Sequence, residues 1–284
     1  MKKTLIALAV AASAVSGMAH AWTNGNFNGT VDIGGSITAD DYRQKWSWAV
    51  GSDINGFSNT LTEMTENGTK LTITVSDNKP ILLGKTNEAF SAPVSGGAGA
   101  IPEISFTDYT GASVALTNPA GETNKGLAYL ILPMKNADGT KIGSVKVNAS
   151  YAGVDAIGRN SGADGDLESL WATSGKIFYG GLPTNVGGSE LQNGDDAVAR
   201  TALFGSLSLN DMLGQIQAVT PNITSLVSKK SSTDEDMQYT DGTVVSAAYS
   251  LGIANGQTIE ATFDKPVTTT TQWSAPLNVA VTYN

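Results

Sequence analysis

WTNGNFNGTVDIGGSI, residues 22–37, alternates between two kinds of residue. Apolar residues and glycines take every second position: Gly25, Phe27, Gly29, Val31, Ile33, Gly35 and Ile37. A side-chain period of two predicts a β-strand with one apolar face. At about 3.3 Å per residue this strand would reach about 40 Å, whereas strands usually have about five or six residues.

The stretch has no hairpin partner beside it in the sequence, so its backbone must pair with a more distant strand. Two interpretations stay open. It is the first strand of a β-sandwich within the same chain, or it joins the sheet of another molecule, with Phe27, Val31 and Ile33 in pockets. In the second case Gly29 would cross a place too shallow for a side chain.

Residues 1–21 have the three parts of a secretory signal peptide. Lys2 and Lys3 precede an apolar run over 5–15, and Ala19-His20-Ala21 forms a small-x-small exit. We expect cleavage after Ala21. The apolar run is too short for an ordinary membrane-spanning helix, and no later stretch has about 18 uninterrupted apolar residues. The mature chain is therefore predicted to be exported and not to span a membrane.

Cysteine and histidine usage excludes several kinds of active site. The chain has no cysteine, and its one histidine, His20, lies in the predicted signal peptide. The mature chain would therefore lack Ser-His-Asp and Cys-His sites, thiolate chemistry and nearly all kinds of zinc site. An exported chain of roughly 260 residues without disulfides needs a true hydrophobic core.

The net charge is −9 and becomes −11 when Lys2 and Lys3 are removed. A negative surface attracts neither nucleic acid nor anionic lipid, so we expect neither as a partner. The 32 glycines and the low charged fraction of 15% are typical of a turn-rich, all-β surface protein.

Alternating or apolar runs predict a series of further strands, at 46–50, 71–75, 79–83, 104–109, 113–116, 126–132, 143–151, 242–249, 256–263 and 277–284. Asp138-Gly139 predicts a tight hairpin turn. Strands at this spacing, with turn residues between them, predict a β-sandwich.

The pattern changes over about 153–236. Leu167, Leu170 and Trp171 have helical spacing, and Asp166 is placed to cap a helix there. Ser208 and Asp211 resemble a capping box before an apolar stripe that runs to 219, and 195–204 predicts a further helical turn or two. We therefore predict a mixed α/β insertion of about 80 residues, in a position where specific function is often found.

Four long segments carry a family resemblance: FNGTVDIGGSITADDYRQKW (27–46), ETNKGLAYLILPMKNADGTKIGSVKVNASYAGV (122–154), YTDGTVVSAAYSLGIANGQTIEATF (239–263) and TQWSAPLNVAV (271–281). With them the chain resembles the FaeG-like family of fimbrial major subunits from Gram-negative enteric bacteria, over nearly all of its length.

The resemblance implies an all-β fold: an incomplete immunoglobulin-like sandwich, completed by donor-strand exchange, with a mixed α/β inserted subdomain. It implies a signal peptide (1–21), a donor-strand extension (22–39) and a pilin domain (40–284) with the insertion at about 153–236. Its implied partners are identical subunits in a surface fibre, a periplasmic chaperone, an outer-membrane usher and a host glycan or glycoprotein receptor. No cofactor and no metal are implied.

The same resemblance assigns residues to two strands. The face inserted into the next subunit would carry Phe27, Gly29, Val31 and Ile33. The chaperone-recognition edge would be the last strand, with Val279, Val281 and Tyr283.

In this family the receptor-binding part is a lectin-like insertion in the sandwich. We place Glu168, Trp171 and Lys176 near a shallow sugar site, because sugar rings stack on aromatic side chains and their hydroxyls bind charged groups. The alternative is that Trp171 fills a small core beneath the insertion.

Other chemistry finds little support in the sequence. Asp164, Asp166 and Glu168 form D-x-D-x-E, but the glycine and the distal glutamate of an EF-hand loop are missing. The acidic residues are scattered through turns, and no pair suits a glycosidase, so we do not expect an enzyme. Two functions stay open: a fimbrial subunit that adheres to host cells, or a capsule-like coat polymer without a sugar site of its own.

Overall fold

The computed structural model describes residues 41–52, 54–91, 99–185 and 187–283. All of them belong to one compact unit, 39–284. The predicted signal peptide and the alternating stretch 22–37 lie outside the described residues, so the boundaries drawn there stay predictions.

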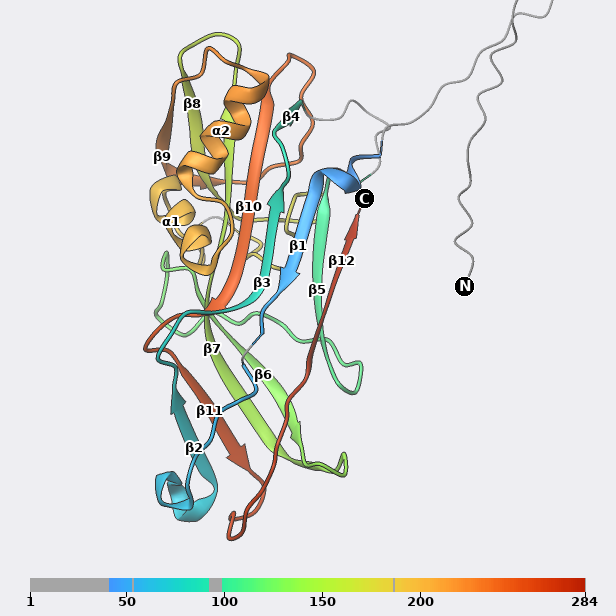
Figure 1. Cartoon of the computed structure of the whole chain (residues 1–284), viewed down its shortest axis with the longest axis vertical. Coiled ribbons are helices and arrows are strands. Elements are labelled where there is room, and N and C mark those ends of the chain that lie inside the picture. Colours follow the sequence, from blue (N-terminus) through green and yellow to red (C-terminus); the bar gives the residue numbers. More distant parts are fainter. Residues whose placement is uncertain (1–40, 53, 92–98, 186, 284) are drawn as a thin grey trace, which may run out of the picture. The chain divides into compact units, whose positions relative to one another are not determined.

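The described chain is a curled β-sandwich that carries two short helices (Figure 1). Its strands are β1 (Trp46–Val50), β2 (Lys70–Thr74), β3 (Lys79–Thr86), β4 (Phe90–Ser91), β5 (Pro102–Asp108), β6 (Leu127–Lys135), β7 (Lys141–Gly158), β8 (Asp164–Leu170), β9 (Ser225–Thr233), β10 (Val244–Ile253), β11 (Thr258–Phe263) and β12 (Leu277–Tyr283). The helices are α1 (Gly194–Phe204) and α2 (Leu209–Val219), with 3-10 turns η1 (Tyr42–Lys45), η2 (Leu61–Glu63) and η3 (Glu66–Gly68).

The 18-residue strand β7 joins the two halves of the structure. Its first half lies between β6 and β11, and its second half lies between β8 and β10. The main sheet follows the order β1-β3-β10-β7-β11-β2, and β12 pairs with β5 in a separate two-stranded sheet. The prediction of a sandwich with an inserted helical part is confirmed.

The hairpin between β6 and β7 forms at the predicted Asp138-Gly139. Gly139 has a φ of 84°, which a residue without a Cβ adopts at no steric cost. The Asn136 side chain supports the turn, because its Oδ1 accepts the N–H groups of Asp138 and Thr140 at 3.1 and 2.9 Å.

Aromatic side chains fill the centre of the sandwich core. Phe178 and Tyr249 are fully buried, with ring centroids 5.4 Å apart. The Phe178 ring stands nearly perpendicular to both tryptophans of β1, with its centroid 5.6 Å from that of Trp46 and 6.1 Å from that of Trp48. Such large apolar rings supply much of the burial that a domain without disulfides requires.

The two helices cover a second core, on the other face of β7 and β10. Its members include Ala156, Leu167, Val198, Met212 and Ile216. The capping box predicted for the second helix is present: Ser208 Oγ accepts the Asp211 N–H at 3.3 Å, and Asp211 Oδ2 accepts the Ser208 N–H at 2.9 Å. The helical turns predicted at 195–204 form α1, which is capped by Asn193 and ended by Gly205.

The prediction of a helix from Asp166 to Trp171 is wrong. Residues 166–170 belong to strand β8, and Trp171 directly follows it. β8 pairs antiparallel with β7 and parallel with β9, so both of its edges are satisfied by the sheet. Leu167 faces the helix-covered core, and the next residue, Glu168, faces the other way. The side chains therefore alternate with a period of two, although the spacing of the apolar residues had suggested a helix. Asp166 caps no helix and instead pairs with Arg159 and Lys229. The strand predicted at 113–116 is also wrong, since only an isolated bridge, Thr107 to Ser113, forms there.

Within the described ranges, no helix is long and apolar enough to cross a membrane.

Gly84 lets the Trp48 ring lie against β3. A Cβ at Gly84 would stand 2.3 Å from Trp48 Cζ3, in the cross-strand pair of β1 and β3. We expect Gly84→Ala to destabilise the protein by about 1–3 kcal/mol, because the indole must move in a packed core. Thermal or denaturant unfolding of the purified protein measures this.

The matched control is Gly214→Ala in α2, where an added Cβ meets no atom within 4 Å. It should stabilise the protein by about 0.5–1 kcal/mol, because alanine favours helix over glycine. Equal effects of the two substitutions would contradict the packing described for Trp48.

Candidate functional site

The end of β1 and the start of β12 border an open groove. In the described structure β1 pairs only with β3, and β12 pairs only with β5, so each strand has a free edge. Val50 and Val279 both line a groove of about 880 Å³ that lies against these edges. The groove exposes backbone hydrogen-bonding groups and apolar side chains at one place, which suits an extended segment.

The floor of the groove is the sandwich core itself. It is formed by Leu130 and Leu132 of β6, Val145 and Val147 of β7, and Ile259 of β11. Ile54, Phe57, Ile81 and Trp273 add apolar side chains at its sides. None of the described residues that line the groove carries a charge. A bound segment must therefore present an apolar face.

The groove leaves the core incomplete on this side. In β12 the inward residues Val279, Val281 and Tyr283 pack on the core yet stay only half-buried, whereas every residue of β10 is buried. Val50, at the end of β1, is 70% exposed. These apolar side chains lack the further layer of atoms that a neighbouring strand would supply.

One end of the groove is bridged by side chains. Trp48 Nε1 of β1 donates a hydrogen bond of 2.9 Å to the Tyr283 hydroxyl of β12. Burial raises the pKa of Tyr283, although the bond from Trp48 opposes this. Tyr283 thus holds the two strands together where β12 ends, and the groove opens toward the other end of β12.

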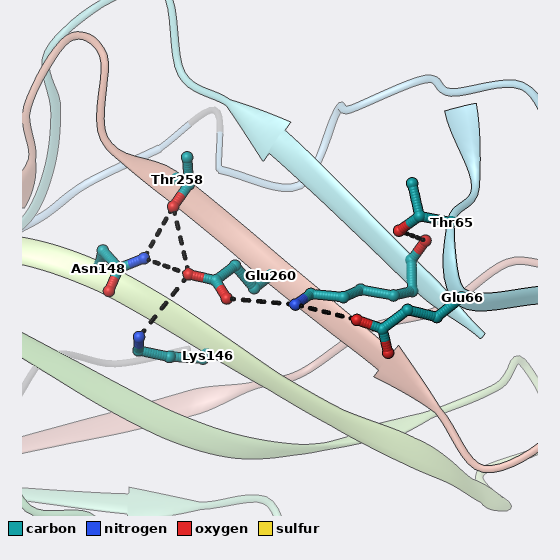
Figure 2. A network of polar contacts seen from close by, with 7 residues as sticks. Thr65, Glu66, Lys146, Asn148, Thr258 and Glu260 are labelled. Carbon is teal, nitrogen blue, oxygen red and sulfur yellow. Dashed lines mark hydrogen bonds and ion pairs between the residues drawn. The ribbon is translucent and has the colours of Figure 1, made fainter. Parts of the chain in front are cut away.

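A polar network braces the floor from its outer face (Figure 2). Glu260 of β11 accepts a hydrogen bond of 2.8 Å from Asn148 Nδ2 of β7 and lies 3.7 Å from Lys146 Nζ. Its other oxygen lies 4.0 Å from Lys70 Nζ, which also pairs with Glu66 at 3.4 Å. Hydrogen bonding from Asn148 lowers the pKa of Glu260, against the effect of burial, and both lysines add to the lowering. The network links β7, β11 and β2, and so keeps Val145, Val147 and Ile259 in register.

Of the three residues proposed for sugar binding, Glu168 lies in β8, and Trp171 and Lys176 lie in the segment after it. Glu168 is half-buried in β8, and burial, followed by the Asp166 charge, raises its pKa. Trp171 follows β8, and its Nε1 is buried without a hydrogen-bond partner in the described structure. Lys176 pairs with Asp236 at 3.1 Å and with Asp234 at 3.6 Å, and these contacts raise its pKa against the effect of burial.

Sequence reasoning missed two sets of residues that line the groove, 51–52 with 54–57 after β1, and 271–276 before β12. Neither has a regular hydrophobic period, so no local signal places them beside the core. Of the residues predicted for function, Val279 lines the groove and Tyr283 closes one end, while the donor residues Phe27, Gly29, Val31 and Ile33 lie outside the described chain.

The whole chain matches known fimbrial proteins. The K88 fimbrial family model, described as fimbrial major and minor subunits, matches residues 1–284. The K88 fimbrial proteins AB and AC of Escherichia coli are each 71% identical to the chain, over 284 and 285 residues. The F41 fimbrial protein of Escherichia coli is 30% identical over 293 residues, and all three matches cover 100% of both sequences. These relatives are fimbrial proteins, and the matching family comprises fimbrial subunits.

The hydrogen bond from Trp48 to Tyr283 should contribute measurably to stability. We expect Tyr283→Phe to lower the free energy of unfolding by about 0.5–1.5 kcal/mol, since one partly buried donor loses its acceptor. Denaturant unfolding tests this, with Thr282→Ala on the exposed face of β12 as the control. A Tyr283→Phe midpoint equal to that of the wild type would show that the bond contributes nothing.

Proposed function

The chain belongs to the K88 family of fimbrial major and minor subunits, and from this premise we propose that it is a major subunit that polymerises by donor-strand exchange. Residues 22–37 of one subunit would enter the groove between β1 and β12 of the next. The fibre would be assembled through a periplasmic chaperone and an outer-membrane usher, and would adhere to host cells.

The observation that carries the proposal is the uncharged groove of about 880 Å³ between two free strand edges. A strand inserted there could pair with β1 on one side and β12 on the other. The face of the stretch with Phe27, Val31 and Ile33 is apolar, as is the floor of the groove, and Gly29 would let the strand pass wherever a side chain has no room. Burial of apolar surface gives about 25 cal/mol per Å², so this match favours insertion.

Donation from each copy to the next gives a heterologous contact. Such contacts extend into an open filament when their rotation does not close a ring. A fibre of identical subunits then needs no other interface type, and every groove except the terminal one is filled.

The proposed chaperone edge follows from the same incompleteness. Val279, Val281 and Tyr283 are half-buried on a strand with one free edge. Before a neighbouring subunit arrives, an exposed edge of this kind promotes aggregation unless another protein covers it. A chaperone that pairs with β12 would meet this need during export, after removal of residues 1–21.

A charge on the apolar face of the stretch tests donor-strand exchange. We expect Val31→Asp to abolish fibres, or to reduce them at least about tenfold, because an unpaired carboxylate would enter an uncharged groove. Fibre yield is measured by electron microscopy and by the high-molecular-weight ladder of unheated samples.

The matched control is Thr30→Asp, which adds the same charge to the polar face. It should leave fibre yield close to that of the wild type. Normal fibres from Val31→Asp would refute the proposed strand exchange, and equal loss from both variants would show that the face does not matter.

We assign adhesion to the inserted part, at Glu168, Trp171 and Lys176. An indole, a carboxylate and an ammonium group supply the stacking surface, acceptor and donor that a sugar requires. The groove lies among β1, β6, β7, β11 and β12, so binding at the insertion would leave polymerisation undisturbed.

Substitutions in the inserted part separate an adhesin from a coat polymer. We expect Trp171→Ala and Lys176→Gln each to reduce fibre binding to host cells roughly tenfold, because the loss of a contact that contributes about 1.4 kcal/mol lowers the affinity tenfold. Lys125→Gln, which removes a lysine paired with Glu122, is the control and should bind normally. Intact fibres with unchanged binding in both test variants would favour the coat polymer.

A further inference from the structure

Asp155 is fully buried without a hydrogen-bond partner. It lies in the second half of β7 with 0% of its surface exposed. Neither carboxylate oxygen has a partner within the described part of the chain. An isolated carboxylate in such a place is very costly, and such groups usually become neutral.

The groups that face Asp155 are mostly acidic. Glu168 of β8 is its cross-strand partner, and Asp166 lies two residues away on the same strand. Ala247 of β10 stands opposite on the other edge and has no polar side chain. The segment after β9 adds Glu235 and Tyr239.

The nearby cations are engaged elsewhere. Arg159 and Lys229 both pair with Asp166, at 2.5 and 2.7 Å. Lys176 pairs with Asp234 and Asp236. Asp155 thus has acidic neighbours and no ion pair of its own to offset the cost of a charge.

Hydrogen bonds distinguish the two buried acids. Glu235 accepts the Met237 N–H and the Tyr239 hydroxyl, the latter at 2.6 Å. Donors of this kind favour the ionised form of a carboxyl group. Asp155 accepts none from another residue. Burial raises the pKa of Glu235 as well, but the Tyr239 hydroxyl and the Met237 N–H oppose that rise, so Asp155 is the better place for the proton and Glu235 for the charge.

We propose that Asp155 is a neutral carboxylic acid in the folded subunit, and that the absence of a charge at this position lets the segment 234–239 and strand β8 pack against β7. Burial, followed by the charges of Glu235 and Glu168, raises the pKa of Asp155 well above its usual 3.8. Proton loss would place a second charge beside Glu235 and loosen the junction between the inserted part and the sandwich. The inference concerns stability and does not depend on strand exchange or adhesion.

The sign of the pH effect follows from the raised pKa. Below 3.8 the group is protonated in both states, and its contribution to stability is complete. As pH rises above 3.8 the unfolded chain releases the proton while the folded chain keeps it, so stability falls until pH reaches the raised folded value. Exposed carboxylates with lowered pKa, such as Asp211, have the opposite effect, because their contribution to stability rises as pH rises. The difference between wild type and Asp155→Asn isolates the Asp155 contribution.

Infrared spectra of assembled fimbriae at about pH 7 test the protonation directly. The wild type should show the C=O band of a protonated carboxyl, and Asp155→Asn should remove it while fibre yield stays normal. Asp138→Asn, in the exposed turn between β6 and β7, should keep the band. Absence of the band in the wild type, or its loss in Glu235→Gln but not in Asp155→Asn, would overturn the proposal.

Thermal unfolding of the same fimbriae at about pH 5 and about pH 8 tests the consequence. Relative to Asp155→Asn, the wild type should lose several degrees of Tm between the two values, whereas Asp138→Asn should follow the wild type. An Asp155→Asn Tm with the same pH dependence as the wild type would overturn the proposed role of the proton.

Discussion

The pairing of β7 is the constraint on which the described structure depends. One half of this strand supplies Val145 and Val147 to the groove, and the other half supports the helices and β8. Its register is held by strands on both edges and by the Glu260 network on its outer face. A shift of one residue would exchange the two faces of the strand. The groove floor and the environment of Asp155 would then be lost together.

The groove is an incomplete part of an otherwise well-packed molecule. Soluble domains usually protect a free strand edge with charge or a covering segment, and large apolar patches are rarely left open. The described lining of this groove has no charge, and both bordering edges are free. A fibre of identical subunits would satisfy the backbone groups and the apolar core in one step, which is why family membership and groove geometry point to the same assembly.

The inserted part and the groove are formed largely by different elements, although strand β7 contributes to both. This separation would let surface contacts change while the polymerising core stays the same. The exception is the junction at Asp155, where Glu168 of β8, itself one of the proposed adhesive residues, stands opposite a buried acid. Substitutions around Glu168 would therefore act on stability as well as on binding.

The sequence by itself determined most strands of the sandwich, though not β4, β8 or β9, together with the Asp138-Gly139 hairpin and the capped helix α2. These features depend on a period of two or on residues within a single turn. The sequence also identified the apolar face of 22–37 and the inward face of β12. Only the tertiary structure decided that Asp164–Leu170 is a strand, since pairing with β7 and β9 outweighs the helical spacing of Leu167 and Leu170. The groove and the orphaned Asp155 were equally hidden from the sequence. Both arise where segments far apart in the chain meet, and no local pattern records what a side chain will face across a sheet.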